Sequence, residues 1–280
     1  MTALRGRSAV GISVVFLFSL ATLLVVLFPF YWTLVTSVKE ASDVFRSPPV
    51  FLPALPTFQN YVTVWNASAI PRYLLNTMVV AGSTVAIVLM VSSMAAYGVS
   101  RFAFQGKLAF LLTLLLAQVM PVTTLIIPLY VFWSKLGLAD GPIALIATYS
   151  AISVPVGTWL LLGFVNGIPR QLDEAARIDG ASSRTILLRI VGPLLAPGLM
   201  ATGLSVFIYV WQELMISMTF VRTDRLKPLM AGVSTFITSK GIEWGPLTAA
   251  GVLSMIPILV VYFFFRRALI RGLTSGAVKG

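Results

Sequence analysis

The chain has 280 residues, of which 58% are hydrophobic and only 10% are charged. A soluble domain carries about 25% charged residues and could not bury so much apolar side chain, so the composition indicates an integral membrane protein. The chain contains neither cysteine nor histidine and has a formal net charge of +11, which excludes disulfides, thiol nucleophiles, haem ligation through histidine and the common zinc sites.

Six apolar segments are long enough to cross a bilayer, since a spanning helix needs roughly 20 apolar residues. The first segment follows two arginines, but it runs without charge far beyond the about 7–15 residues of a signal-peptide core, so we expect it to be retained. We therefore predict an all-α integral membrane protein with six transmembrane helices. The predicted spans lie at about residues 9–38, 73–100, 108–134, 142–166, 194–220 and 245–265.

The distribution of lysine and arginine predicts the orientation of the chain. If the N-terminus is cytoplasmic, the inner segments hold 12 lysines and arginines in 57 residues, and these segments are 1–8, 101–107, 167–193 and 266–280. The outer segments hold 8 in 65 residues, and these are 39–72, 135–141 and 221–244. This bias predicts that both termini are cytoplasmic. Basic residues beside a lipid bilayer also explain the positive charge, so we expect no nucleic-acid partner.

The outer segment 39–72 has its own character, with four prolines in "SPPVFLPALPTFQNYVTVW" followed by Phe58, Tyr61 and Trp65. The prolines predict an extended stretch. The aromatic residues predict a short amphipathic helix at the membrane surface, and a plain interfacial anchor is the favoured interpretation.

A polar stretch, "EAARIDGASSRTILLRIVGPLLAP" at residues 174–197, separates the fourth and fifth apolar segments. Its start favours a helix, in which Asp173 or Glu174 can pair with Arg177. Gly180 supplies the left-handed residue that ends a helix. Ser182 or Ser183 can cap the next helix, and Pro193 and Pro197 suit a helix start.

These features predict a helix, a turn and a second helix held between two membrane spans. Such an elbow could transmit displacement between the membrane bundle and a docked cytoplasmic partner. A solvated loop, whose charges keep it out of lipid, is an equally open interpretation on physical grounds alone.

The same stretch resembles the EAA loop of permeases from binding-protein-dependent ABC importers. The matching residues are Glu174-Ala175-Ala176, Gly180, Ile190 and Pro193, while Gly192 stands where leucine is usual. The resemblance extends to the MalG-type permeases of the sugar-importing branch. It is carried by "TFQNYVTVW" (57–65), "NTMVVAGSTVAIVLMVSSMAAYGVSRF" (76–102), "PLYVFWSKLGL" (128–138), "IPRQLDEAARIDGAS" (168–182) and "RGLTSGAVKG" (271–280).

This resemblance implies a MetI-like permease core with an extra N-terminal span. The division would be an N-terminal span and outer connection (1–72), a core (73–265) that includes the coupling loop (167–193), and a cytoplasmic tail (266–280). The coupling loop would dock on a separate ATPase subunit through Glu174, Ala175, Ala176, Asp179, Gly180 and Ala181. The tail would also reach the ATPases, through Thr274, Ser275, Gly276, Lys279 and Gly280, although a frayed end is the alternative.

The resemblance further implies alternating access driven by partners. These are a second permease subunit, two copies of an ABC ATPase and an extracytoplasmic solute-binding protein, in a bacterial or archaeal plasma membrane. The chain has no "GxxxxGK[ST]" motif, so ATP and Mg²⁺ would be bound by the ATPase, and we expect no cofactor or metal on this chain. It offers no catalytic constellation, and we expect a transport subunit that is not an enzyme.

Polar residues in the spans are candidates for a solute path. Glu213 is the only charged residue within a predicted span and would lie near its outer end. With Trp211 and Gln212 it either lines the path, since aromatic faces and amides suit sugars, or it is an interfacial carboxylate. Asn76 and Gln118 are either path residues or interhelical hydrogen-bonding groups. The outer loop 221–244 either contacts the solute-binding protein or is a basic anchor.

The favoured function is uptake of a sugar or oligosaccharide. The alternative is an importer of another solute, such as a glycerol phosphodiester, a polyol or a polyamine. A phosphorylated solute would call for arginine or lysine along the path, and the predicted spans contain none. A stand-alone secondary transporter would need intramembrane ion-coupling groups, for which one off-centre carboxylate is weak support.

Overall fold

A computed structural model describes residues 9–239 and 241–277, with the side chains of Ala9, Val10, Ile12, Ala67 and 266–277 left out of the description. Within these residues the regular secondary structure is helical apart from a short antiparallel hairpin of β1 (Ile237–Thr238) and β2 (Gly241–Ile242). It forms two compact units. One combines the residues up to Ser68 with Val233–Met255, and the other combines Ala69–Gly232 with the residues from Ile256 onward.

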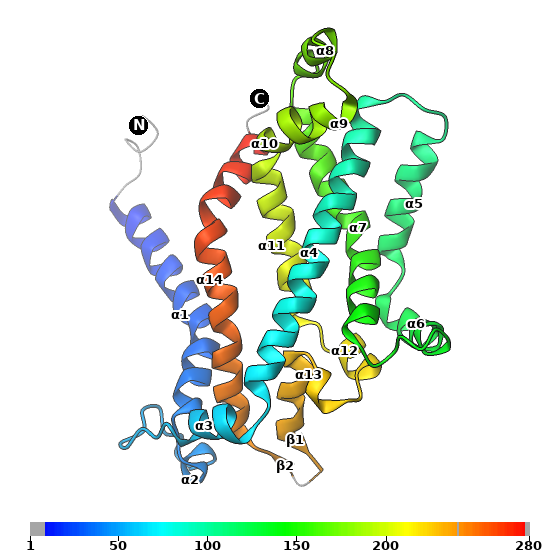
Figure 1. The fold of residues 1–280 in the computed structure, drawn as a ribbon. Helices are drawn as coiled ribbons and strands as arrows, with labels where there is room; N and C mark the ends of the chain where they lie inside the picture. The colour runs from blue at the N-terminus through cyan, green and yellow to red at the C-terminus, as the bar shows by residue number, and fades with distance from the viewer. Residues whose placement is uncertain (1–8, 240, 278–280) are drawn as a thin grey trace. The chain divides into compact units, whose positions relative to one another are not determined.

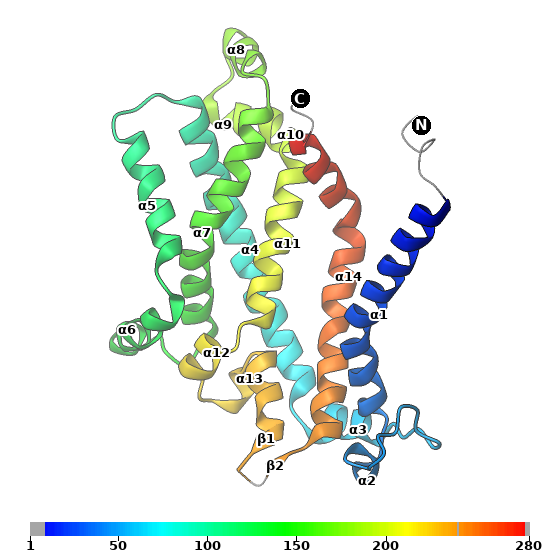
Figure 2. The same ribbon diagram turned by 180° about the vertical axis from the view of Figure 1, so that it is seen from behind.

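The second unit is a helical bundle in which α4, α7 and α11 lie side by side (Figure 1). Figure 2 shows α5 beside α7 on the outside of this bundle. The polar helix α8 lies at one end of the unit, and α6 and α12 lie at the other. The long helices are α4 (Ile70–Arg101), α5 (Lys107–Val119), α6 (Val122–Lys135), α7 (Pro142–Gly167) and α11 (Ala196–Gln212).

Short helical elements connect these helices. Between α7 and α11 lie α8 (Gln171–Ile178), α9 (Ser183–Ile186), the π-helix η2 (Leu187–Val191) and α10 (Gly192–Leu194). After α11 come α12 (Met215–Phe220), the 3-10 helix η3 (Asp224–Leu226) and α13 (Leu229–Val233).

The first unit contains α1 (Ala9–Ser37), α2 (Ala41–Val44), α3 (Gln59–Val62), the π-helix η1 (Thr63–Ala67), the 3-10 helix η4 (Ser234–Phe236), the β hairpin and the start of α14 (Trp244–Ala277). The predicted short helix after the prolines is present as α3 and η1. Asn60 Nδ2 fastens it to the end of α1 by donating to the carbonyls of Ser37 (2.9 Å) and Lys39 (3.1 Å). Burial lowers the pKa of Lys39, whose ammonium lies 4.1 Å above the Trp32 ring, and nearby Asp43 opposes that shift.

Small residues allow α4 and α7 to pack closely. Ser92 on α4 is buried and donates to the Val154 carbonyl of α7 over 3.1 Å. Gly157 faces it, and a Cβ at that position would lie 2.8 Å from Ser92 Oγ and 3.0 Å from Val88 Cγ1. Close approach through small residues is the usual basis of helix packing in a membrane, where burial of apolar surface between helices gains little.

Four helical segments are long and apolar enough to cross a membrane by themselves, namely Ser13–Ser37, Ile70–Arg101, Pro142–Gly167 and Trp244–Phe265. Two further spans are formed only if bent helix pairs are counted, so the described chain has four to six. The predicted spans over 108–134 and 194–220 are not single helices. The first is divided into α5 and α6 with a bend of 97°, and the second is divided between α11 and α12.

The bend between α5 and α6 follows from proline geometry. Met120 is extended, with φ −68° and ψ 125°, because a residue before proline avoids the helical region. Pro121 then stands at the N-cap of α6. A second bend of 79° separates Ser183–Leu194 from α11, next to Pro193 and Pro197. The break after Gln212 has no proline or glycine beside it and is explained below by the Glu213 side chain.

The close approach at Gly157 predicts a packing penalty. Gly157→Ala should lower the free energy of unfolding by about 1–3 kcal/mol, because the new methyl group overlaps Ser92 and Val88. Gly163→Ala is the matched control on the same helix, where a Cβ meets nothing within 4 Å, and it should be neutral or stabilising by up to about 1 kcal/mol. The midpoint of thermal unfolding in detergent measures both, and equal midpoints would contradict the prediction.

Candidate functional site

The elbow between α7 and α11 has the predicted turn and cap. Gly180 adopts φ +83°, its N–H donates to the Arg177 carbonyl (3.0 Å), and the N–H of Ala181 donates to the Ala176 carbonyl (2.9 Å). Ser182 then begins the next helix, since its Oγ accepts from the Thr185 N–H over 3.3 Å. Glycine satisfies the left-handed position without strain, and the serine satisfies one of the free N–H groups at the start of α9.

A buried ion pair anchors α8 to the bundle. Arg101 Nε lies 3.1 Å from Asp173 Oδ2, and both side chains are at most 5% exposed. Tyr97 donates to the other carboxylate oxygen over 3.0 Å. The arginine also donates to the Ile168 carbonyl over 2.9 Å. The end of α4 is thereby fixed to the segment that enters α8 and to α8 itself.

The sequence left open whether Asp173 or Glu174 pairs with Arg177, and the structure pairs Asp173 with Arg101, which comes from another helix. The Arg177 guanidinium instead lies 5.7 Å from the centre of the Phe102 ring. Burial decides between these partners, because a carboxylate that is 4% exposed needs a charge that is buried with it.

One side of the elbow is packed and the other is exposed. Its buried side joins an apolar cluster made of Ala96, Tyr97, Val99, Leu161, Leu162, Val165, Ile168, Ala176, Ile186, Val191 and Leu195. The residues Gln171, Glu174, Ala175 and Ile178 are spaced to share one face of α8, and all four are exposed. Ile178 is 88% exposed, which leaves a large apolar side chain beside a charged and a small one.

The other residues predicted for ATPase coupling fall on different parts of this elbow. Ala176 is buried, Ala181 is half-buried and Asp179 is exposed at the end of α8. In the predicted tail, Thr274, Ser275 and Gly276 belong to the last turns of α14, and only their backbone is described. Lys279 and Gly280 lie outside the described residues.

Glu213 caps a helix at the break in the fifth predicted span. It is extended, with φ −73° and ψ 127°, and its carboxylate accepts from the N–H groups of Ile216 (2.8 Å) and Ser217 (3.1 Å) at the start of α12. Tyr149 of α7 donates to the same carboxylate over 2.6 Å. These bonds satisfy N–H groups that a helix start leaves free, so the carboxylate makes the break possible without proline or glycine.

The structure does not join the predicted path residues into one polar cluster. Trp211 is 1% exposed and stacks on Phe207, whereas Gln212 is exposed. Asn76 Nδ2 donates to the carbonyls of Arg225 (3.0 Å) and Lys227 (2.9 Å). Gln118 is exposed and its Nε2 lies 3.4 Å from a carbonyl of its own helix. Among these described side chains, no hydrogen bond links Asn76, Gln118 or Glu213 to one another.

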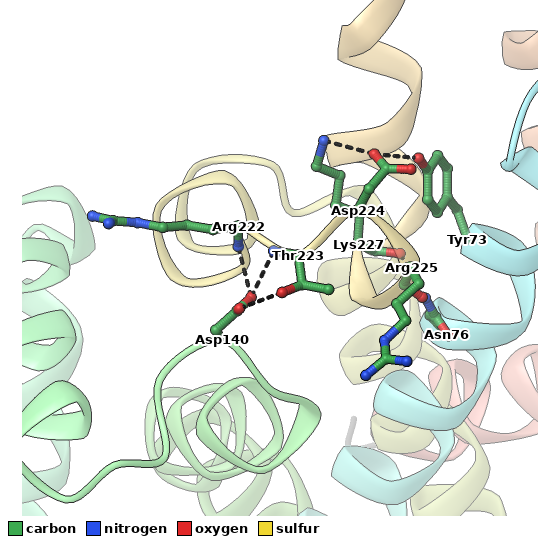
Figure 3. Close-up of polar contacts among 8 residues, drawn as sticks. All are labelled: Tyr73, Asn76, Asp140, Arg222, Thr223, Asp224, Arg225 and Lys227. Carbon is green, nitrogen blue, oxygen red and sulfur yellow. Dashed lines mark hydrogen bonds and ion pairs between the residues drawn. The ribbon is translucent and has the colours of Figure 1, made fainter.

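Three side chains of other segments hold the stretch after α12, as Figure 3 shows. Asp140, in the turn between α6 and α7, accepts from the N–H groups of Arg222 and Thr223, both at 2.8 Å, and from Thr223 Oγ1 at 2.6 Å. Tyr73 of α4 donates to Asp224 over 2.8 Å. Asn76 adds the two bonds to carbonyls described above.

The carboxylates of Asp140 and Asp224 both have a lowered pKa. Burial alone would raise the pKa of Asp140, but the hydrogen bonds from Thr223 and Arg222 outweigh burial and lower it below 3.8. Hydrogen bonds from Lys227 and Tyr73 lower the pKa of Asp224. Because the folded-state pKa of Asp140 is lowered, its stabilising contribution is present above pH 3.8 and is lost as the pH falls through the lower folded value.

Comparison with known proteins identifies the family. Residues 88–275 match the model of the binding-protein-dependent transport system inner membrane component. The chain belongs to this family. It is therefore a multi-pass membrane permease and a transport subunit, and it is not itself an enzyme.

Curated relatives match the permease over nearly its whole length. It is 36% identical over 260 residues to the trehalose/maltose transport system permease protein MalG of Thermococcus litoralis, covering 92% of this chain and 93% of the relative. It is 31% identical over 254 residues to the sulfoquinovosyl glycerol transport system permease protein SmoH of Agrobacterium fabrum, covering 91% and 89%. It is 31% identical over 253 residues to the diacetylchitobiose uptake system permease protein DasC of Streptomyces coelicolor, covering 90% and 92%.

Solved structures share the fold of the permease. A chain of a bacterial ABC transporter involved in the import of the acidic polysaccharide alginate superposes with a TM-score of 0.80 at 21% identity, covering 94% of the permease and 99% of that chain. A chain of the alginate transporter in complex with a pentasaccharide-bound periplasmic protein gives a TM-score of 0.67 at 14% identity, covering 90% and 92%. The prediction of an ABC importer permease fold is confirmed.

Sequence reasoning missed three residues that the structure makes prominent in the permease. Ile178 is the last residue of the helix that carries Glu174-Ala175-Ala176, and an isoleucine at a surface position of a polar helix was a signal for a contact surface. Arg101 could have been noticed as a basic residue at the inner end of an apolar segment. Asp140 could be found only from the structure, because its partners are backbone N–H groups far along the chain.

The buried ion pair gives the first prediction for this site. Arg101→Leu should lower the free energy of unfolding by about 3–5 kcal/mol, because it leaves the Asp173 carboxylate buried without its charge partner. It should also expose α8 to protease. Arg46→Leu is the control, since Arg46 is 66% exposed in a 3.7 Å pair with Asp43 and should cost under about 1 kcal/mol. Thermal unfolding and limited proteolysis in detergent measure both effects.

The cap at Glu213 gives a second prediction. Glu213→Ala should destabilise the permease by about 1–3 kcal/mol, because two N–H groups and the Tyr149 hydroxyl lose their acceptor. Tyr149→Phe removes one of these three bonds and should cost less. Glu243→Ala, at an exposed carboxylate, is the control. If Glu213→Ala leaves the unfolding midpoint unchanged while transport falls, the carboxylate acts on solute and not as a cap.

Proposed function

We propose that the permease carries a sugar or oligosaccharide into the cell by alternating access, driven by ATP hydrolysis on a separate ATPase. The observation that carries the substrate class is the set of curated relatives. Three of them, at 31–36% identity, are named for trehalose and maltose, a sulfoquinovosyl glycerol and diacetylchitobiose, and each of these three matches covers at least 90% of this chain. All of these solutes carry a sugar unit.

The elbow has the properties that ATPase coupling requires. Its buried side is fixed to α4 by the Arg101–Asp173 pair, so a displacement of α8 is passed to the bundle and not absorbed by a loose loop. Its exposed face offers Glu174 for a polar contact, Ala175 for close approach and Ile178 for burial. In this proposal Gly180 fixes the angle of the turn, while Asp179 and Ala181 flank the contact.

The remaining partners complete the proposal. A second permease subunit forms the translocation path with this chain, and two ATPase subunits bind ATP and Mg²⁺ on the cytoplasmic side. The residues Thr274–Gly280 extend toward the ATPases. A solute-binding protein delivers sugar to the opposite side, near Gln212 and the outer loop 221–244. The lysine and arginine bias supports cytoplasmic termini in the plasma membrane of a bacterium or an archaeon.

The substrate is tested by uptake into proteoliposomes that contain the whole complex with its ATPases and solute-binding protein. ATP-dependent uptake of labelled trehalose, maltose or a sulfoquinovosyl glycerol supports the proposal. Uptake of a glycerol phosphodiester, a polyol or a polyamine in their place overturns the sugar assignment while leaving the importer intact. Uptake without ATP, driven by an ion gradient, overturns the coupling mechanism.

The coupling face gives a specific prediction. Ile178→Ser should weaken binding of the ATPase by about 10–100-fold, because a buried isoleucine contributes about 1.5–3 kcal/mol. Ile178→Val is the matched control and should retain most of the affinity. The Kd is measured between the detergent-solubilised permease pair and the purified ATPase. Equal affinity of the wild type and Ile178→Ser would remove Ile178 from the contact.

A further inference from the structure

The stretch from Phe220 to Leu229 is held on two sides by side chains of other elements. On one side Asp140 makes three hydrogen bonds to Arg222 and Thr223. On the other side α4 contributes Tyr73 and Asn76, together with Thr77, whose Oγ1 accepts from the Leu229 N–H over 2.7 Å. We call the stretch of residues 220–229 the outer strap.

The backbone conformation of Asp140 places its side chain against the start of the strap. It has φ +65° without being a glycine, and its N–H donates to the Phe220 carbonyl over 3.0 Å. Its carboxylate then meets two consecutive N–H groups, which form a favourable concavity for an anion. An aspartate side chain is short enough to adopt this backbone region and to bond at close range. The turn and the start of the strap are therefore locked together.

The strap presents two arginines. Arg222 is exposed, and its guanidinium lies 5.3 Å from the centre of the Tyr130 ring. Arg225 is exposed on the other part of the strap, where Asn76 binds its carbonyl. Figure 3 shows the Arg222 guanidinium pointing away from Asp140, whereas the Arg225 guanidinium points in a different direction, below the strap in this view. The third cation of the strap, Lys227, is already paired with Asp224 at 2.9 Å.

We propose that Asp140 is a positioning residue that holds Arg222 and Arg225 as a preformed cationic edge for an acidic face of the solute-binding protein. This inference rests on the proposed function. Arginine forks match carboxylates, and the strap lies at the end of its unit opposite α8, away from the face proposed for the ATPase. Because the backbone that carries the arginines is ordered before binding, docking loses less conformational entropy than it would with a flexible loop.

The experiment uses the complete complex in nanodiscs and measures ATPase rate against the concentration of sugar-loaded binding protein. Asp140→Ala should raise the half-maximal concentration by about tenfold while the maximal rate is retained. Misplaced arginines weaken binding of the solute-binding protein but do not change ATP hydrolysis once that protein is bound. Arg222→Ala with Arg225→Ala should produce a similar rise. Adding Asp140→Ala to the Arg222→Ala, Arg225→Ala double variant should raise the half-maximal concentration little further. Asp43→Ala, in the exposed pair with Arg46, is the matched control and should leave the curve unchanged.

A reversible crosslink separates positioning from a folding defect. The chain has no cysteine of its own, so Asp140→Cys with Thr223→Cys can be oxidised to replace the hydrogen bonds by a disulfide. The oxidised pair should restore the wild-type half-maximal concentration, and addition of reductant should raise it again. If the disulfide forms and the concentration does not return, the proposal is overturned.

The remaining outcomes are distinguishable. If the wild-type complex does not respond to any binding protein, the proposed function fails. If the wild type responds and Asp140→Ala responds identically, only the positioning role fails. If Asp140→Ala changes the response in nanodiscs with anionic lipid but not in zwitterionic ones, the arginines bind lipid headgroups and the proposal is overturned.

Discussion

The contact between Arg101 and Asp173 is the interaction on which the arrangement of the elbow between α7 and α11 depends. Two opposite charges are withdrawn from solvent at the point where α4 ends and α8 begins. Such a pair contributes little net stability compared with apolar packing, but removing one member is costly. Its effect is to hold α8 against the end of α4. The elbow is consequently fixed on its apolar side, while Gln171, Glu174, Ala175 and Ile178 of α8 stay exposed.

The opposite end of the same unit is held by a different chemistry. There, carboxylate and amide side chains bind backbone groups, as Asp140 and Asn76 do in the strap and Glu213 does at α12. These bonds satisfy backbone groups at the start of α12 and along the stretch that follows it. The permease thus uses buried charge pairing at one end and side-chain-to-backbone bonding at the other, and its spans connect two structured surfaces.

Local chemistry predicted the elbow well, and tertiary contacts explain where prediction failed. Gly180 and Ser182 were recognisable because a left-handed turn and a helix cap each favour few residue types. The Arg101 partner of Asp173 was not predicted, because spacing along one helix cannot show which distant arginine is buried with it. The bend at Pro121 was foreseeable from the preceding Met120, but proline also occurs inside spans. The break at Glu213 depends on the hydrogen bond from Tyr149 and on the N–H groups at the start of α12, and hydropathy reveals neither.

The exposure of Ile178 has a consequence for the life of the subunit in the cell. A permease that has not met its ATPase displays a bare apolar side chain at the tip of a polar helix, which is the feature that chaperones and quality-control proteases recognise in incomplete assemblies. In the proposed complex, the ATPase covers that side chain. Under that proposal the amount of permease follows the supply of the ATPase, because only copies without an ATPase keep Ile178 uncovered.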